Sequence, residues 1–144
     1  MRQLEQQMTV SGNSPHTLTF PEAAAQSFEV GEPVVLDAAG AVTVAATGAA
    51  SVVGVAAMPA TTVAGRPVTV WIANDDTLFG VVMPGAVQAD IKKLVTLNKA
   101  AGVWTADRAT AGTFLVMEIQ TLPNGQKIAR GKFLESATQL GKAA

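Results

Sequence analysis

The chain holds few residues that could carry out chemistry. His16 is the only histidine among the 144 residues, and cysteine is absent. A Ser-His-Asp triad, a Cys-His pair and a histidine or thiolate metal site would each lack essential members. We therefore expect no catalytic residue, no metal ligand and no cofactor, and a protein that is not an enzyme.

The acidic residues that could build a site fall at expected turns. Asp75 and Asp76 are adjacent, and Asp37, Asp90 and Asp107 could join them in acid-base chemistry or calcium binding. Aspartate is favoured in turns because its side chain accepts hydrogen bonds from nearby backbone N–H groups. The D-x-D-x-D-G spacing of a calcium loop is absent. We interpret these residues as turn formers.

Aromatic side chains could offer a platform on which sugars stack. The chain has two tryptophans, Trp71 and Trp104, five phenylalanines and no tyrosine. A folded chain of this length needs most of so few aromatic residues in its core. A carbohydrate-binding module stays open as an alternative, and it would require Trp71 or Trp104 to be exposed beside a groove.

The composition points to a surface that neighbouring subunits cover. Hydrophobic residues make up 49% of the chain, but charged residues only 15%, against about 25% in a typical soluble domain. Charge keeps a monomer wetted and breaks up apolar patches. We infer contact with other subunits, and a monomer with an alanine- and threonine-rich surface remains the alternative.

Charge and hydropathy argue against nucleic-acid and membrane binding. The net charge is -1 and the basic residues are scattered, so the basic patch of a nucleic-acid binder is missing. Residues 38–65 carry no charge, but glycine and proline interrupt this segment and its apolar residues alternate, so it does not read as a membrane helix.

Residues 1–10 lack the apolar core of a secretory signal. Absent cysteine fits assembly in a reducing cytoplasm.

The first part of the chain predicts an extended N-terminal arm over residues 1–20. Met8–Val10 and His16–Phe20 are extended pieces around the turn-forming run Ser11–Pro15. Such an arm could pack on its own domain or reach a neighbouring subunit. Pro21–Gln26 has proline followed by helix formers, which favours one or two helical turns.

Residues 21–134 predict a single all-β domain, a small β-barrel or β-sandwich. From Gly31 onward, short β-type runs alternate with glycine, proline, asparagine and aspartate. The expected strands are Pro33–Leu36, Ala41–Ala45, Ser51–Met58, Pro67–Ala73, Thr77–Met83, Leu94–Leu97, Gly102–Ala106, Thr113–Gln120 and Gln126–Leu134. Ala86–Leu94 favours a short helical turn that leads into a strand. Residues 135–144 lack apolar periodicity and predict a loose or docked tail.

An internal repeat divides the expected domain into two similar hairpin units. Val34–Thr43 is echoed by Val95–Thr105. Further along, Val52–Ala56 corresponds to Phe114–Glu118, and Pro67–Ile72 to Lys127–Phe133. One such unit could not bury its own apolar face, so two that close on each other are expected.

Two segments of the first half resemble a known family. Gly31–Gly40 (GEPVVLDAAG) followed by Val52–Ala56 (VVGVA) resembles the hairpin and the VGVA strand of phage head decoration, or cement, proteins. The resemblance covers Gly31–Ile72 well and the second half more loosely. It implies a structural virion protein on the capsid exterior, assembled in the host cytoplasm, that clamps neighbouring major capsid protein subunits. It carries over no catalytic residue.

The resemblance also implies a homo-oligomer, with a trimer favoured and a dimer possible. For contacts with the capsid or between subunits, the predicted residues are those of the arm: Met8, Val10, His16, Leu18 and Phe20. An extended arm can add a strand to a partner's sheet through main-chain hydrogen bonds. A β module associated with a tail, baseplate or fibre would share this composition and is the main alternative.

Overall fold

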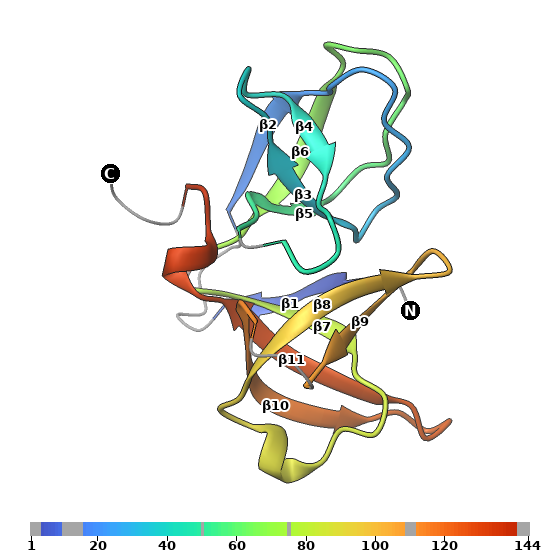
Figure 1. Cartoon of the computed structure of the whole chain (residues 1–144), viewed down its shortest axis with the longest axis vertical. Coiled ribbons are helices and arrows are strands. Elements are labelled where there is room, and N and C mark those ends of the chain that lie inside the picture. Colours follow the sequence, from blue (N-terminus) through green and yellow to red (C-terminus); the bar gives the residue numbers. More distant parts are fainter. Residues whose placement is uncertain (1–3, 10–15, 50, 75, 109–111, 141–144) are drawn as a thin grey trace.

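The computed structural model describes residues 4–9, 16–49, 51–74, 76–108 and 112–140, and within them the chain is nearly all β (Figure 1). Two short 3-10 helices are its helical elements there, η1 (Gln88–Asp90) and η2 (Glu135–Ala137). The strands are β1 (Leu4–Thr9), β2 (Thr17–Pro21), β3 (Pro33–Leu36), β4 (Val42–Val44), β5 (Gly54–Ala56), β6 (Pro67–Ile72), β7 (Thr77–Val82), β8 (Leu94–Ala100), β9 (Val103–Asp107), β10 (Phe114–Thr121) and β11 (Lys127–Phe133). The predicted all-β class is confirmed.

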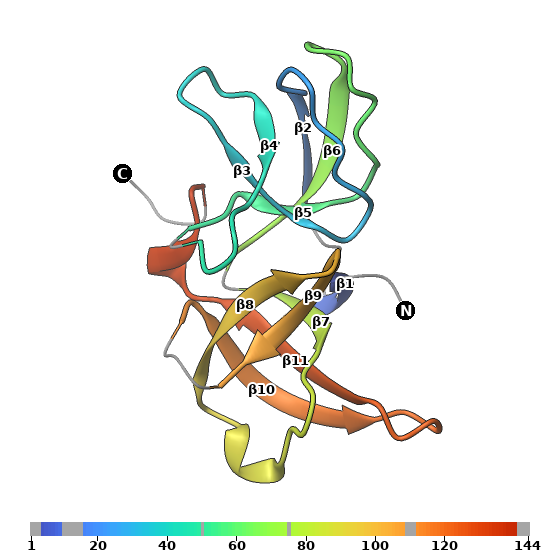
Figure 2. The same ribbon diagram turned by 45° about the vertical axis from the view of Figure 1, so that its right-hand side comes forward.

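The strands form two curled antiparallel sheets, one above the other in Figures 1 and 2. Strands β2 to β6 form what we call the first unit, a five-stranded sheet in the order β2-β6-β5-β3-β4. Strands β7 to β11 form the second unit, whose sheet is completed by β1 in the order β1-β7-β11-β10-β8-β9. Strand for strand, the two orders are the same once β1 is set aside.

Backbone hydrogen bonds confirm the internal repeat and correct its alignment. Gly31 N–H donates to Ala56 O, and Ala56 N–H to Glu32 O, over 2.9 and 3.0 Å. In the second unit Lys92 N–H donates to Val116 O and Val116 N–H to Lys93 O, over 2.8 and 3.0 Å. Ala56 is therefore equivalent to Val116.

The predicted pairing of Val52–Ala56 with Phe114–Glu118 was consequently displaced by two residues. The register places Gly54 opposite Val34, and Phe114 opposite Val95, so the equivalent segments are Gly54–Ala56 and Phe114–Val116. A bulge follows in β10 between Val116 and Glu118, and it has no counterpart in the short strand β5. Local sequence similarity could not reveal that difference.

Strand β6 shows a clear two-residue alternation of buried and half-buried side chains. In β6, Val68, Val70 and Ile72 are buried, while Thr69 and Trp71 lie on the opposite, half-buried face. Alternation of this kind gives a strand one face for the core. Side chains from both units, among them Val55, Trp104 and Phe133, meet in one apolar cluster, so the two units share a core.

Gly54 marks a close approach of two backbones. A Cβ atom at this position would overlap the carbonyl oxygen of Trp71 in the neighbouring strand β6. The β5–β6 pairing therefore depends on glycine here.

The helical turn predicted for Pro21–Gln26 is wrong. Pro21 ends β2, Glu22 forms a bridge to Val42, and Ala23 N–H donates to Val42 O over 3.0 Å. These bonds commit the backbone to β4, and local helix propensity is too weak to override them. The turn predicted within Ala86–Leu94 is confirmed by η1 and the start of β8.

The hairpin of β8 and β9 is longer than expected. Strand β8 continues to Ala100, and the turn consists of Ala101 and Gly102, both with positive φ. Positive φ at both central residues is typical of the type I′ turn, which suits the twist of two paired strands.

The two ends of the described chain tie the units together. Leu4 N–H donates to Gly31 O over 2.8 Å, so β1 lies on the second unit's sheet and also contacts the first unit. Near the other end, the Gln139 side chain accepts from Leu36 N–H and donates to Leu36 O, over 2.8 and 3.1 Å. Within the described residues, helices are too short to span a membrane.

Candidate interaction surface

The structure divides the predicted contact residues between the two sheets. Met8 lies in β1, opposite Leu78 of β7. His16, Leu18 and Phe20 belong to the segment that pairs with β6. Val10 lies outside the described residues. A deletion of residues 1–20 would remove a strand from each sheet, so it would test folding as well as binding.

Strand β2 presents the apolar part of this segment to solvent. Leu18 is 48% exposed and Phe20 is half-buried against the core of the first unit. Leu18 and Phe20 lie opposite the buried residues Val70 and Val68 of β6, so both side chains are on the core face of the sheet. An exposed leucine on a core face is the feature expected of a contact surface.

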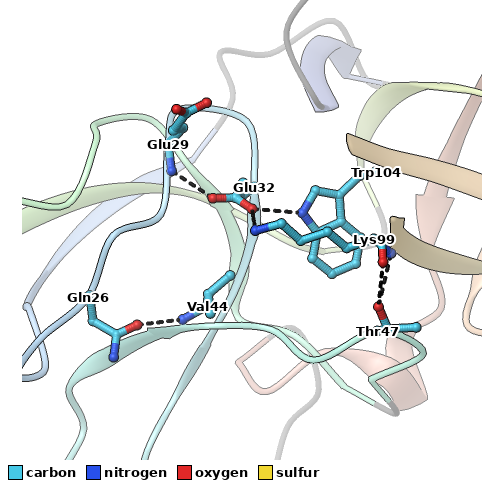
Figure 3. A network of polar contacts seen from close by, with 7 residues as sticks. All are labelled: Gln26, Glu29, Glu32, Val44, Thr47, Lys99 and Trp104. Carbon is cyan, nitrogen blue, oxygen red and sulfur yellow. Dashed lines mark hydrogen bonds and ion pairs between the residues drawn. The ribbon is translucent and has the colours of Figure 1, made fainter. Parts of the chain in front are cut away.

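A buried polar network links the two units elsewhere (Figure 3). Glu32, which is 3% exposed, lies just before β3 in the first unit. Its carboxylate accepts the indole N–H of Trp104 over 3.0 Å and the ammonium of Lys99 over 2.5 Å, both from the second unit. It also accepts Glu29 N–H over 2.8 Å. These bonds fix the relative position of β3 and the β8–β9 hairpin.

Hydrogen bonds around Lys99 extend the same junction. The Thr47 hydroxyl accepts Lys99 N–H over 3.0 Å, and Gly48 N–H donates to Leu97 O over 2.9 Å. Burial alone would raise the pKa of Glu32, but the hydrogen bonds from Lys99, Glu29 and Trp104 together with the Lys99 charge outweigh it and hold this pKa below its ordinary value. Glu32 is therefore ionised at neutral pH.

Asp90 is a buried carboxylate with a structural role. It is fully buried in η1, where it accepts Val87 N–H over 2.9 Å and forms an ion pair with the Arg108 guanidinium over 3.0 Å. The Val87 hydrogen bond lowers the pKa of Asp90 most; burial raises it, and the charges of Arg108 and Lys93 lower it further. The carboxylate caps its own turn and anchors the chain beyond β9.

The other candidate carboxylates do not meet in one site. Asp37 accepts the N–H groups of Ala39 and Ala41 in the β3–β4 turn, which confirms its predicted role. Asp107 ends β9 and accepts the Asn98 amide over 3.3 Å. Asp75 lies outside the described residues. Among the residues that the structure describes, no group of acidic or histidine side chains could hold a metal ion.

The tryptophans do not form an exposed platform. Trp104 is 1% exposed and Trp71 is half-buried against the shared core. A surface groove has no aromatic residue in its lining, which consists of Met83, Pro84, Asn98, Ala100, Thr105, Ala106, Asp107 and Arg108. A sugar-binding module would require a tryptophan exposed beside a groove, and neither Trp71 nor Trp104 meets this condition.

Sequence reasoning missed Glu32 and Glu22 as buried acids. Glu22 is 1% exposed and accepts the N–H and hydroxyl of Thr61 over 2.8 and 2.9 Å. In the sequence, both glutamates have mainly apolar neighbours, and the chain as a whole has few charges. This position among apolar residues could have indicated a buried acid, because a buried charge is usually paired or hydrogen-bonded.

No protein-family model matches the sequence, and no curated protein matches it.

Proposed function

We propose that this chain is a structural virion protein that binds the outer surface of a phage capsid and stabilises it by clamping neighbouring capsid subunits. The observation that carries the proposal is β2: an uncharged border strand with Leu18 48% exposed on the core face of its sheet. Such a strand can extend a partner's sheet through main-chain hydrogen bonds.

The construction of the junction supports this proposal. A clamp has to resist relative motion of its two halves. Here the units are joined by a shared apolar core, by the ion pair of buried Glu32 with partly exposed Lys99, and by the hydrogen bonds of the Gln139 side chain with Leu36. The segments that resemble decoration proteins contain β3 and β5, which are neighbours in the interior of the first unit's sheet. A low charge content suits a protein whose surface is covered after assembly.

The test is where the chain binds on a virus particle. Purified full chain is mixed with separated, expanded heads and with separated tails of a phage that carries the encoding gene, and bound protein is measured by co-sedimentation. Saturable binding to heads, with added density on the capsid lattice in cryo-electron microscopy, is expected. Binding to tails alone would favour the tail or fibre module instead, and binding to neither would refute the proposal.

A matched pair of variants connects the binding to β2. Leu18→Lys places a charge on the border strand and is expected to weaken head binding. Val103→Lys changes a residue of equal exposure, 49%, on the border strand β9 and is expected to leave binding unchanged. Equal binding by the two variants would remove β2 from the proposed contact.

A further inference from the structure

Among the described residues, the sheet of the first unit ends in a strand with a neighbour on one side. Strand β2 is the terminal strand of that sheet, and within the described part of the chain its one partner is β6. Ile72 N–H donates to His16 O, and Glu22 N–H to Arg66 O. Antiparallel pairing alternates, so the N–H and C=O groups of Thr17 and Thr19 point to the outer side. No described residue forms a backbone hydrogen bond with them there.

The internal repeat shows what a covered version of this border looks like. Val70 and Gly131 are equivalent, because they lie opposite the equivalent residues Ala56 and Val116. Leu18 lies opposite Val70, and Phe79 opposite Gly131. Leu18 is therefore equivalent to Phe79, and by the same register Thr19 corresponds to Gly80 and Phe20 to Val81.

The equivalent border in the second unit carries an added strand. Strand β1 pairs antiparallel with β7, with Leu4 opposite Val81 and Glu5 opposite Gly80. Leu4, Phe79 and Val81 are all fully buried in one cluster. In the first unit, the counterpart of Val81 is Phe20, which is half-buried, and the counterpart of Phe79 is Leu18, which is 48% exposed. The missing element in the first unit is thus an antiparallel strand with an apolar residue opposite Phe20.

Strand β2 of a second copy supplies that residue in the required register. If two β2 strands pair antiparallel about a two-fold axis at Thr19, each Leu18 lies opposite Phe20 of the other copy. Leu18 then takes the position that Leu4 holds opposite Val81, and Thr19 takes the position of Glu5 opposite Gly80. This pairing reproduces both the leucine and its register.

The chemistry of β2 suits pairing with itself. Thr17–Pro21 carries no charge, so two copies bring no like charges together. Pro21 has no N–H group, which ends the ladder after the central residues. A two-fold contact also closes on two copies and leaves neither β2 border open to a third.

We propose that this chain forms a homodimer in which β2 pairs antiparallel with β2 of the second copy about Thr19. The sequence suggested a trimer or a dimer, and this two-fold contact between β2 strands favours the dimer. The proposed capsid contact uses the same outer side of β2, so this dimer is the state of the free chain, and it has to open before β2 extends the sheet of a capsid subunit. The test therefore uses the purified chain alone, where dimerisation is measured separately from head binding.

The experiment is sedimentation equilibrium of the full chain from about 1 to 200 µM, a range suited to a small interface. We expect a mass that rises towards twice the chain mass of 14.7 kDa. Leu18→Lys and Thr19→Pro should each raise the dimer dissociation constant by about tenfold or more. Thr19→Pro removes an outward N–H group while leaving the bonds to β6 in place.

Two control variants test whether a loss of dimerisation is specific to the β2–β2 contact. Val103→Lys introduces the same charge on another border strand, and Thr69→Val removes the 3.5 Å hydroxyl contact with Thr19 without altering the border. Both should dimerise like the parent chain. In addition, the chain has no cysteine, so Thr19→Cys should form a disulfide-linked dimer on mild oxidation. A trimer, a monomer throughout, or a dimer that survives both β2 substitutions would overturn the proposal.

Discussion

The indole N–H of Trp104 donates to the carboxylate of Glu32 across the junction of the two units, over 3.0 Å. Trp104 is 1% exposed and Glu32 is 3% exposed, so water does not substitute for either partner. The bond joins the strand β9 to the start of β3, so one buried carboxylate contributes directly to the arrangement of the two units.

Replacing Glu32 should therefore destabilise the whole fold. Glu32→Ala leaves the buried Trp104 N–H without its acceptor, which costs about 2 kcal/mol of unfolding free energy. Urea denaturation followed by tryptophan fluorescence measures this loss. Glu29→Ala is the matched control, because only the backbone of Glu29 takes part in the network, and it should change stability by less than about 0.5 kcal/mol. Equal midpoints for the two variants would contradict this role of Glu32.

Stability should fall in acid through the buried carboxylates. Glu22, Glu32 and Asp90 all have a pKa below their ordinary values of 4.5, 4.5 and 3.8 in the folded chain. A lowered folded pKa adds stability that is complete above the unfolded pKa and is lost as pH falls through the folded one. The free energy of unfolding should be level from about pH 7 to 5.5 and should decline below about pH 4.5.

The Glu32→Gln variant isolates one part of this acid response. Glutamine does not titrate, so the variant should start less stable at pH 7 and should lose less stability between pH 5 and pH 3 than the parent chain. Urea denaturation at each pH measures both quantities. Parallel pH profiles for the two chains would show that Glu32 contributes nothing to the response.

Substitution of Gly54 should be far more damaging than substitution of a turn glycine. A Cβ atom at Gly54 overlaps the Trp71 carbonyl oxygen, so Gly54→Ala must separate β5 from β6 and should cost about 3 kcal/mol. At Gly40 a Cβ atom meets nothing within 4 Å, and only its φ of +80° opposes a side chain. Gly40→Ala should cost about 1 kcal/mol. Thermal and urea denaturation compare the two, and an equal loss would argue against the close approach.

Local patterns were sufficient to predict much of the fold. In the sequence, Val68, Val70 and Ile72 alternate with Thr69 and Trp71, and this two-residue period predicts β6. Asn124-Gly125 is a strong hairpin signal and predicts the turn between β10 and β11. These features depend on residues close in the chain. The internal repeat also predicted that the two sheets are alike, because similar residues form the equivalent hairpins of both units.

Contacts between the units could not be predicted in this way. Glu32 and Lys99 are 67 residues apart, and neither has a local motif that names the other. Leu18 was named as a contact residue from its place in the arm, but its exposure follows from the absence of a described strand beside β2. Pro21–Gln26 was misassigned for a similar reason, because its backbone bonds to the distant residue Val42.

Asp90 should stabilise the second unit mainly as a cap. Its carboxylate accepts Val87 N–H and forms an ion pair with the Arg108 guanidinium, and Asp90→Ala removes the hydrogen bond and the ion pair from a fully buried position. Arg108 is partly exposed and can be rehydrated, so the loss should be close to that of a buried cap, about 2 kcal/mol. Asp90→Asn keeps an acceptor for Val87 and should lose about half as much.

The matched control for Asp90 is Gln88→Ala in the same 3-10 helix. Gln88 is exposed, and its replacement should change the free energy of unfolding by less than about 0.5 kcal/mol. Urea denaturation ranks the variants, and hydrogen exchange at Val87 reports the cap directly. Faster exchange at Val87 is expected in Asp90→Ala and not in Asp90→Asn. If Asp90→Asn were as unstable as Asp90→Ala, the ion pair with Arg108 and not the cap would be the main contribution of Asp90.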